Sequence, residues 1–272
     1  MHGVLQTSTL SNVYSNMKIS IITTCYNRVK TIAQTIESVL AQNYPDIEYI
    51  IVDGASTDGS LAVIRNYESR IARIISDPDN GMYEAINKGI KVATGDIVGL
   101  LHSDDFFINP YIVSEIADMF SRTDADVVYG NGLYVDTEHT DKVIRNWVSG
   151  NYRHWKVRFG WLPLHPTVYI KRSVIEKYGM YDESYKIASD SDFLVRYLWE
   201  TDLHIEYLNR YILKMRMGGL STDSQKRKLM WNEDVRMYRS HGFFGIPEKL
   251  MKMCWKVPQF IDAKLKRKFS DD

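Results

Sequence analysis

The sequence has little cysteine, no long apolar run and no excess of charge of either sign. Among its 272 residues only Cys25 and Cys254 are cysteines, which excludes a disulfide framework and a cysteine-based zinc site. Two isolated thiols indicate a reducing, cytosolic setting. No run of about 18 apolar residues occurs, so the sequence predicts no membrane-spanning helix.

The charges cancel, because 34 Lys and Arg balance 34 Asp and Glu. This balance argues against a generic nucleic-acid binder, whose binding surface is usually strongly basic. Apolar residues make up 44% of the chain and charged residues 25%, which excludes global disorder. The length suits one large domain or two small ones.

Residues 1–16 are rich in Ser, Thr and Asn and lack the basic and apolar segments of a secretory signal. We therefore expect a disordered extension there, with the folded chain starting at Met17.

From Lys18 onward, predicted strands alternate with predicted helices. The strands are expected at 18–24, 47–53, 71–76 and 97–101, and the helices at 31–42, 61–67 and 82–93. This alternation is typical of βαβ units and a mostly parallel sheet. Beyond Pro110 we expect helices at 111–121, 172–178 and 190–201, strands at 126–129, 133–147 and 203–213, and a basic helical segment from 225 onward.

Acidic residues follow three of the four predicted strands. Asp53 ends the second, Asp77 and Asp79 follow the third, and Asp104 and Asp105 follow the fourth. Ligands of such sheets bind at the carboxyl ends of the strands. Carboxylates gathered there are costly unless a cation or a ligand offsets their charge. The pattern therefore indicates a binding site at this edge of the sheet.

Asp104 and Asp105 admit two interpretations. Mg²⁺ or Mn²⁺ is typically held by one or two carboxylates together with substrate phosphates, and adjacent acids after a buried strand suit that role. They can equally be turn residues ahead of the helix at 111–121. No glycine-rich phosphate loop occurs in the chain. If a nucleotide binds, its phosphates would therefore have to be bound through a metal ion held by these acids.

Asp53 also admits two interpretations. Its carboxylate can accept hydrogen bonds from the ring N–H of a pyrimidine or from ribose hydroxyls, or it can serve the turn that follows. Asp58, in the same turn-rich segment, is expected to cap the helix at 61–67.

Three segments together resemble glycosyltransferase family 2. They are 23–27 (TTCYN), 51–60 (IVDGASTDGS) and 77–89 (DPDNGMYEAINKG), and weaker motifs extend the likeness to about residue 222. The resemblance implies a GT-A fold and an inverting transfer from a nucleotide-sugar, usually with Mn²⁺ or Mg²⁺. It also implies a catalytic domain at 17–224, with a nucleotide-sugar half at 17–105 and an acceptor half at 106–224.

By this resemblance, Thr23 and Asp53 hold the nucleoside, and Asp104 matches the metal-binding acid. The first acid of the family's D-x-D-D element is replaced, since the chain reads His102-Ser103-Asp104-Asp105. His102 then either hydrogen-bonds a ribose hydroxyl or water, or only fills space. The remaining expected donor-binding residues are Tyr26, Asp79, Lys88 and Ser103.

The resemblance places the general base in the segment 188–193, where Ser189 replaces the family's Glu and Asp190 is the expected base. Ser189 and Asp192 also fit a capping box, so Asp192 is expected to be structural. Asp190 and Asp192 are about 200° apart on a helix and cannot both contact one substrate.

The resemblance gives three further residues a place near the sugars or phosphates. His165 is expected near the acceptor and donor sugar, and Arg216 near a phosphate. Trp161 belongs to an aromatic segment that suits either sugar stacking or the core.

In the segment 225–272 basic residues outnumber acidic ones and are interleaved with aromatic residues. This composition fits a helix on an anionic membrane surface. It equally fits a helix packed on the catalytic domain with a solvated basic face. The neutral total is therefore the sum of an acidic domain and a basic tail.

The combined prediction is an α/β enzyme that transfers one sugar, UDP being the expected nucleotide because Asp53 suits uracil. The expected acceptor is a saccharide or lipid-linked saccharide of a bacterial surface polysaccharide. We expect a cytoplasmic protein, peripheral on the inner face of the cytoplasmic membrane. A nucleotidyltransferase of sugar phosphates is the alternative, but the segment after the first strand is not the glycine-rich basic loop that such an enzyme should have.

Overall fold

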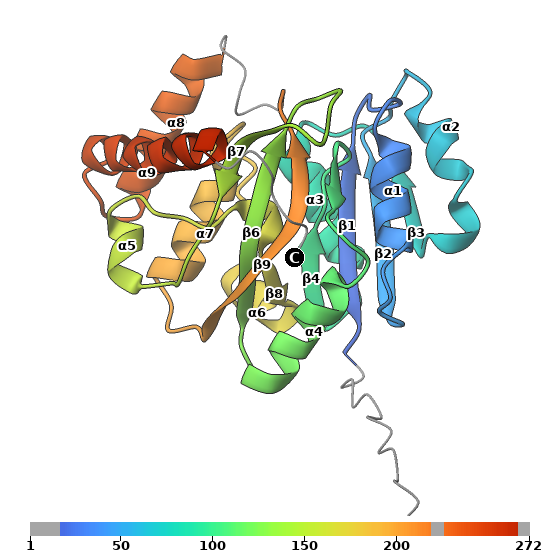
Figure 1. Ribbon diagram of the computed structural model, residues 1–272, viewed down its shortest axis with the longest axis horizontal. Helices are drawn as coiled ribbons and strands as arrows, with labels where there is room; N and C mark the ends of the chain where they lie inside the picture. Colours follow the sequence, from blue (N-terminus) through green and yellow to red (C-terminus); the bar gives the residue numbers. More distant parts are fainter. Residues whose placement is uncertain (1–16, 219–225, 266–272) are drawn as a thin grey trace, which may run out of the picture.

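The computed structural model describes residues 17–218 and 226–265. In this part of the chain, nine strands form one sheet (Figure 1). Their order is β3-β2-β1-β4-β8-β6-β9-β5, and β7 pairs with β6. The strands are β1 (Ile19–Cys25), β2 (Ile47–Asp53), β3 (Arg73–Ser76), β4 (Ile97–Leu100), β5 (Asp105–Phe107), β6 (Val127–Val135), β7 (Val143–Trp147), β8 (Tyr169–Lys171) and β9 (Ile205–Arg216). The first four are parallel, and β9 is parallel to β6. The expected α/β class is confirmed.

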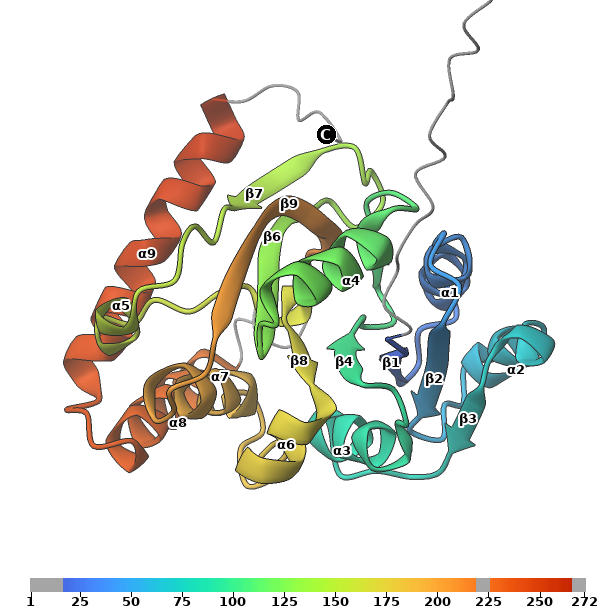
Figure 2. The same ribbon diagram turned by 90° about the horizontal axis from the view of Figure 1, so that it is seen from below.

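Helices cover both faces of the sheet (Figure 2). They are α1 (Ile32–Leu40), α2 (Ser60–Arg65), α3 (Met82–Val92), α4 (Ile112–Thr123), α5 (His154–Arg158), α6 (Arg172–Tyr178), α7 (Ser189–Trp199), α8 (Arg227–Ser240) and α9 (Ile246–Leu265). Apolar residues of α1, α2 and α4 join one core cluster, and those of α3, α6, α7 and α8 join the other. Within the described ranges, no helix is both long and apolar enough to cross a bilayer.

Strand β2 shows why the central strands are rich in apolar residues. Ile50 and Val52 belong to one core cluster, whereas Tyr49 and Ile51 belong to the other. Successive side chains of a strand point to opposite faces, so a parallel strand covered on both sides needs apolar residues on both faces. Such largely apolar segments made the first strands predictable from sequence.

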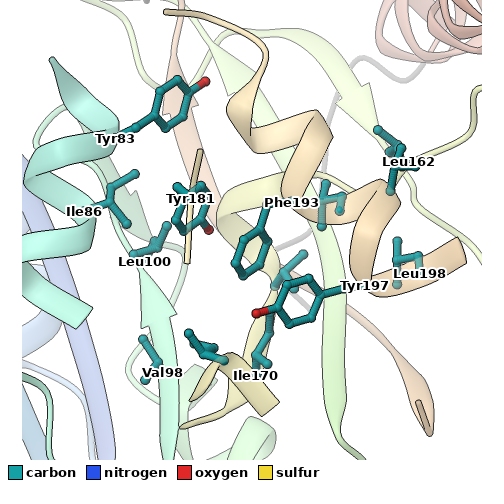
Figure 3. Packing of buried hydrophobic residues seen from close by; sticks show 14 of the residues in the cluster. Tyr83, Ile86, Val98, Leu100, Leu162, Ile170, Tyr181, Phe193, Tyr197 and Leu198 are labelled. Carbon is teal, nitrogen blue, oxygen red and sulfur yellow. The ribbon is translucent and has the colours of Figure 1, made fainter. Parts of the chain in front are cut away.

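An aromatic stack fixes α7 against the sheet (Figure 3). The rings of Tyr181, Phe193 and Tyr197 lie in sequence, with both centroid separations 4.2 Å. Stacked aromatic pairs add about 0.5–1.5 kcal/mol each beyond their burial. The amino end of α7, where Asp190 lies, is thereby held in place.

Some expected boundaries were wrong. Strand β6 continues from Val127 to Val135, beyond the expected end at 129, and a turn at Asp136 then leads to β7. The amide nitrogens of Glu138 and His139 donate to the Asp136 carboxylate, which closes this turn. The expected extension at 1–16 and the expected domain boundary at 224/225 lie outside the described residues.

The C-terminal helices pack on the catalytic domain, but three lysines of α9 do not lie on a solvated face. Helix α9 lies along β7 and α8 contacts α7 (Figure 2). Lys249 is buried, and Lys252 and Lys256 are partly buried, because these side chains point toward the protein. The basic composition seen in the sequence therefore does not describe the outer face of α9.

Candidate active site

The candidate site lies at the carboxyl ends of β1, β2 and β4, at the upper edge of the sheet in Figure 1. In the pairing of β1 with β2, Cys25 is opposite Asp53, so the two strands end together. Strand β4 is parallel to β1 on its other side and leads into the segment 102–105. The expected acidic edge is thus assembled by the sheet itself.

Asp53 is a buried carboxylate with one oxygen in use. Its Oδ2 accepts hydrogen bonds from the amide of Ser56 at 3.1 Å and from the hydroxyl of Ser76 at 2.8 Å. Its Oδ1 is buried and has no partner within the described residues. An unpaired buried carboxylate oxygen is costly, which fits an acceptor that serves a ligand N–H.

The neighbouring threonines of β1 point to opposite faces. Thr23 is fully buried, and its hydroxyl pairs with that of Tyr49 at 3.1 Å. Thr24 points the other way, with its hydroxyl 3.5 Å from Nδ1 of His102. Tyr26, just beyond the strand, is well exposed. The geometry therefore favours Thr24 and Tyr26 over Thr23 as donor contacts.

Asp79 lies against Gly54, the residue after Asp53. A Cβ on Gly54 would overlap the Asp79 carboxylate, so a larger residue there would displace the Asp79 side chain. Burial raises the pKa of Asp79, and the amide of Gly81, which donates to Oδ1 at 3.0 Å, opposes that rise. Lys88 is paired with Glu84 at 3.1 Å and donates to the carbonyl of Pro78 at 2.7 Å. Its ammonium is therefore engaged with its own loop.

Two arginines flank Asp104. The Nε of Arg28 lies 3.7 Å from Oδ2 of Asp104, and Nη1 of Arg216 donates to the Asp104 carbonyl at 2.7 Å. Asp105 is buried, with one oxygen unpaired among the described residues, and burial together with the Asp104 charge raises its pKa well above the usual range. Asp104 is thus the less buried acid of the pair, and the arginines supply positive charge beside it.

The imidazoles of His102 and His165 lie together, with ring centroids 6.3 Å apart. His165 is in the 3₁₀ turn His165–Thr167, and its Nε2 is 2.7 Å from the Tyr181 hydroxyl. Burial and then the neighbouring His102 lower the pKa of His165 to about 3, which keeps it neutral near pH 7. Burial also lowers the pKa of His102, against the effect of Asp104. The two halves of the domain therefore meet at these rings.

Asp190 lies in the first turn of α7 and is half-buried. Its Oδ1 accepts from the amide of Ser191 at 2.7 Å. Burial raises the pKa of Asp190; the ammonium of Lys252 opposes this rise, and the carboxylate of Asp234 adds to it. A carboxylate with a raised pKa is suited to general base catalysis.

A run of contacts joins the acid pair to the helix that carries Asp190. His102, two residues before Asp104, lies beside His165, and His165 reaches the Tyr181 hydroxyl. The Tyr181 ring in turn stacks on Phe193 of α7, with centroids 4.2 Å apart. The segment 102–105 and the amino end of α7 are therefore linked through the core, although they are 85 residues apart in sequence.

Asp192 is structural, as expected, but by other contacts than a capping box. It pairs with His241 at 3.0 Å and with Arg196 at 3.6 Å. Helix α7 begins at Ser189, whose hydroxyl is buried without a partner among the described residues, so the expected serine cap is wrong. The expected Asp58 cap is also displaced, because Gly59 precedes α2 and Asp58 accepts from the Ser60 amide at 2.9 Å.

Trp161 and Ser103 contribute mainly to packing. Trp161 is 5% exposed, packs edge-on against Tyr129 and donates its indole N–H to the Ser149 carbonyl at 3.0 Å. Ser103 is buried, and its carbonyl accepts from the Thr31 hydroxyl at 2.8 Å. The structure thus supports the core interpretation of Trp161.

Sequence reasoning missed four residues that contact this site: Thr24, Arg28, Ser76 and Lys252. Strand alternation could have separated Thr24 from Thr23. The absence of a phosphate loop could have drawn attention to Arg28, the first basic residue after β1. No sequence signal joins Lys252 to Asp190, because α9 approaches α7 only in three dimensions.

The chain is similar in sequence to known glycosyltransferases. The profile of "Glycosyl transferase family 2" matches residues 20–184. An uncharacterized glycosyltransferase of Mycobacterium tuberculosis is 32% identical over 180 residues, 65% of this chain and 68% of that protein. A PGL/p-HBAD biosynthesis glycosyltransferase of Mycobacterium bovis is 26% identical over 207 residues, 74% of this chain and 78% of that protein.

Solved structures confirm the expected GT-A fold. S. aureus TarS 1–349 in complex with UDP aligns with a TM-score of 0.64 at 20% identity, over 82% of this chain and 65% of that one. A mannosyltransferase from Pyrobaculum calidifontis with GDP-Man and Mn²⁺ aligns with a TM-score of 0.60 at 15% identity, over 91% of this chain and 74% of that one. With the family profile covering more than half of the sequence, the chain belongs to glycosyltransferase family 2 and is a glycosyltransferase.

Proposed function

We propose that this enzyme moves one sugar from a nucleotide-sugar, with UDP as the nucleotide, to a saccharide or lipid-linked saccharide acceptor with inversion at the anomeric carbon. The observation that carries the proposal is a run of contacts that joins the acidic strand ends to α7, whose first turn carries Asp190. It passes from His102 to His165, from His165 to Tyr181, and from Tyr181 to Phe193 of α7. The complexes of TarS with UDP and UDP-GlcNAc, and of the mannosyltransferase with GDP-Man, support the donor class. Surface polysaccharide assembly is the process we propose for it.

The nucleoside would bind at the ends of β1 and β2. Oδ1 of Asp53 is free to accept the ring N–H of uracil, since Oδ2 is already held by Ser56 and Ser76. Thr24 and the exposed ring of Tyr26 stand at the end of the adjacent strand. A buried acceptor that is satisfied only by a base N–H would discriminate strongly between nucleotides.

The diphosphate would lie beside Asp104. Within the described residues, no group of three or more His, Cys, Asp or Glu side chains could enclose a metal ion. One accessible carboxylate together with phosphate oxygens does fit Mn²⁺ or Mg²⁺. A bound ion would neutralise charge on the departing diphosphate. Arg28 and Arg216 add positive charge at the same place.

Asp190 would act as the general base. The acceptor hydroxyl attacks the anomeric carbon and gives its proton to the Asp190 carboxylate. The new bond forms from carbon to acceptor oxygen, while the bond from carbon to phosphate oxygen breaks and its electron pair leaves with the diphosphate. A positioned base contributes roughly 10²–10⁴-fold to the rate of such steps.

The test is sugar transfer or donor hydrolysis with a panel of nucleotide-sugars, with Mn²⁺ and after chelation. Asp190→Asn should lower kcat about 10²–10⁴-fold with little change in donor affinity. Asp104→Asn should weaken both activity and the response to metal. Asp192→Asn, on the same helix, is the control. It should lower the thermal midpoint, whereas its kcat should stay near that of the wild type. Full activity of Asp190→Asn would refute its role as base.

A further inference from the structure

Helix α9 is apolar on its outer face and polar on its inner face, the reverse of an ordinary surface helix. The inward stripe is Lys249, Lys252, Lys256, Gln259 and Ala263, all buried or partly buried. The outward stripe is Leu250, Met253, Val257 and Ile261, which are 49%, 48%, 55% and 53% exposed. Spacings of three and four residues keep each stripe on one side of the helix.

The inward contacts fix this orientation. The ammonium groups of Lys249 and Lys252 both bond the buried Asp234 of α8, and Lys252 also donates to the Ser191 hydroxyl at 2.7 Å. Further along, Gln259 accepts from Nε of Arg145 at 2.6 Å. Turning α9 over would leave Asp234 as an unpaired buried charge, which costs several kcal/mol. The apolar stripe is therefore held toward the outside.

The apolar surface continues from α9 onto α5. The indole N–H of Trp255 donates to the Phe159 carbonyl at 2.9 Å, and the ring of Phe159 packs edge-on with that of Trp155 at 6.0 Å. Both of these rings are about half exposed. Figure 2 shows α5 against α9 at the outer edge of the molecule. Exposed apolar side chains therefore lie on both α9 and α5, and apolar surface gathered in this way marks interaction sites.

The exposed charges of the two C-terminal helices point to the partner. The exposed charged side chains of α8 and of α9 up to residue 264 are all basic: Arg227, Lys228, Arg236, Arg239 and Lys264. The acids of the same helices are buried, apart from the half-buried Asp262. In sequence, Lys266, Arg267 and Lys268 follow directly, and Asp271 and Asp272 come after them. Exposed cations on the pair of helices that carries the apolar stripe match an anionic bilayer, whereas two copies of this chain would bring like charges together.

We propose that the surface formed by the outward stripe of α9 with Trp155 and Phe159 of α5 docks on an anionic lipid bilayer, with α9 lying in the plane of the headgroups. This inference goes beyond the transfer reaction and does not depend on Asp190 being the base. A lipid-linked acceptor would then meet the enzyme at the bilayer.

The experiment is flotation of the full chain with vesicles of phosphatidylcholine and phosphatidylglycerol, and with vesicles of phosphatidylcholine alone. The wild type should float with the anionic vesicles and much less with the neutral ones. Val257→Glu should reduce the bound fraction about tenfold, because it replaces an inserted apolar group with a repelled charge. Leu250→Glu, one end of the same stripe, should do the same.

Tyr111→Glu is the matched control, since Tyr111 is 56% exposed, close to the 55% of Val257, and precedes α4. It should float like the wild type, and unchanged thermal midpoints should show that all variants fold. Failure of the wild type to float, or flotation of both stripe variants at the level of the wild type, overturns the proposal. So does a dimer that Val257→Glu converts to monomer, which would assign this face to a contact between copies.

Discussion

Replacing Lys252 with methionine should raise the pKa of the proposed base Asp190 and move the pH profile of sugar transfer. The Lys252 ammonium donates to the Ser191 hydroxyl at 2.7 Å, and that hydroxyl is 3.3 Å from Oδ1 of Asp190. Because the two bonds share the Ser191 oxygen, ammonium and carboxylate are at most about 6 Å apart. The positive charge favours the ionised carboxylate and opposes the effect of burial.

Coulomb's law sets the expected size of the effect. At about 6 Å, two unit charges interact by roughly 0.7 kcal/mol at the dielectric constant of water and about 3 kcal/mol at an effective value near 20. Since about 1.4 kcal/mol corresponds to one pKa unit, removing the ammonium should raise the pKa of Asp190 by about 0.5 to 2 units. Asp234 keeps its contact with Lys249, so the variant should remain folded.

The assay is kcat/KM for sugar transfer as a function of pH. A base acts when deprotonated, so activity rises as pH passes its pKa, and in Lys252→Met this rise should move to higher pH by that amount. Lys252→Arg should restore the wild-type profile, and Lys264→Met, an exposed lysine of α9, should leave it unchanged. A folded Lys252→Met enzyme with an unmoved profile would refute the coupling of Lys252 to the base.

Two further predictions concern stability. Burial alone would raise the pKa of Glu48, but hydrogen bonds led by those from Ser20 and Thr94 lower it to about 2. The ionised carboxylate therefore stabilises the fold at pH values above its unfolded pKa near 4.5, and this stabilisation is lost as the pH falls toward 2. Glu48→Gln should lower the free energy of unfolding by up to about 3 kcal/mol at pH 7, measured by denaturant titration. The difference from the wild type should become smaller below pH 4.5. Gly160 and Gly150 both have positive φ, but a Cβ on Gly160 would meet the Glu248 carbonyl of α9 at 2.5 Å, whereas one on Gly150 would meet nothing within 4 Å. Gly150→Ala should thus lower the free energy of unfolding by about 1–2 kcal/mol, and Gly160→Ala should lower it clearly more. Equal thermal midpoints of the two variants would contradict this prediction.

The sequence predicted the first half of the sheet well because each element there depends on its own residues. Strands β1 and β2 are rich in apolar, largely β-branched residues, and the helix between them has apolar residues at helical spacing. The acidic residues follow from the same logic, since parallel strands end at one edge. The position of Asp53 could therefore be predicted, although its single free oxygen could not.

The second half depends on pairings between distant segments. Strand β9 pairs with both β6 and β5, and no local pattern indicates either partner. The direction of the lysines on α9 was also unpredictable, because it depends on Asp234 of α8 and on Ser191 of α7. Composition identified an amphipathic basic helix but assigned its lysines to the wrong side.

The pairing of β5 with β9 has a consequence for synthesis on the ribosome. Arg216, at the end of β9, is 112 residues after Asp104, whose carbonyl it contacts. At 5–20 residues per second, roughly 5 to 20 s separate the emergence of these two residues. During that interval β1, β2 and β4 can already pair, whereas β5 has no strand to join. The nascent chain should thus form the strand ends around Asp53 first and complete the surroundings of Asp104 only when nearly the whole catalytic domain has been made.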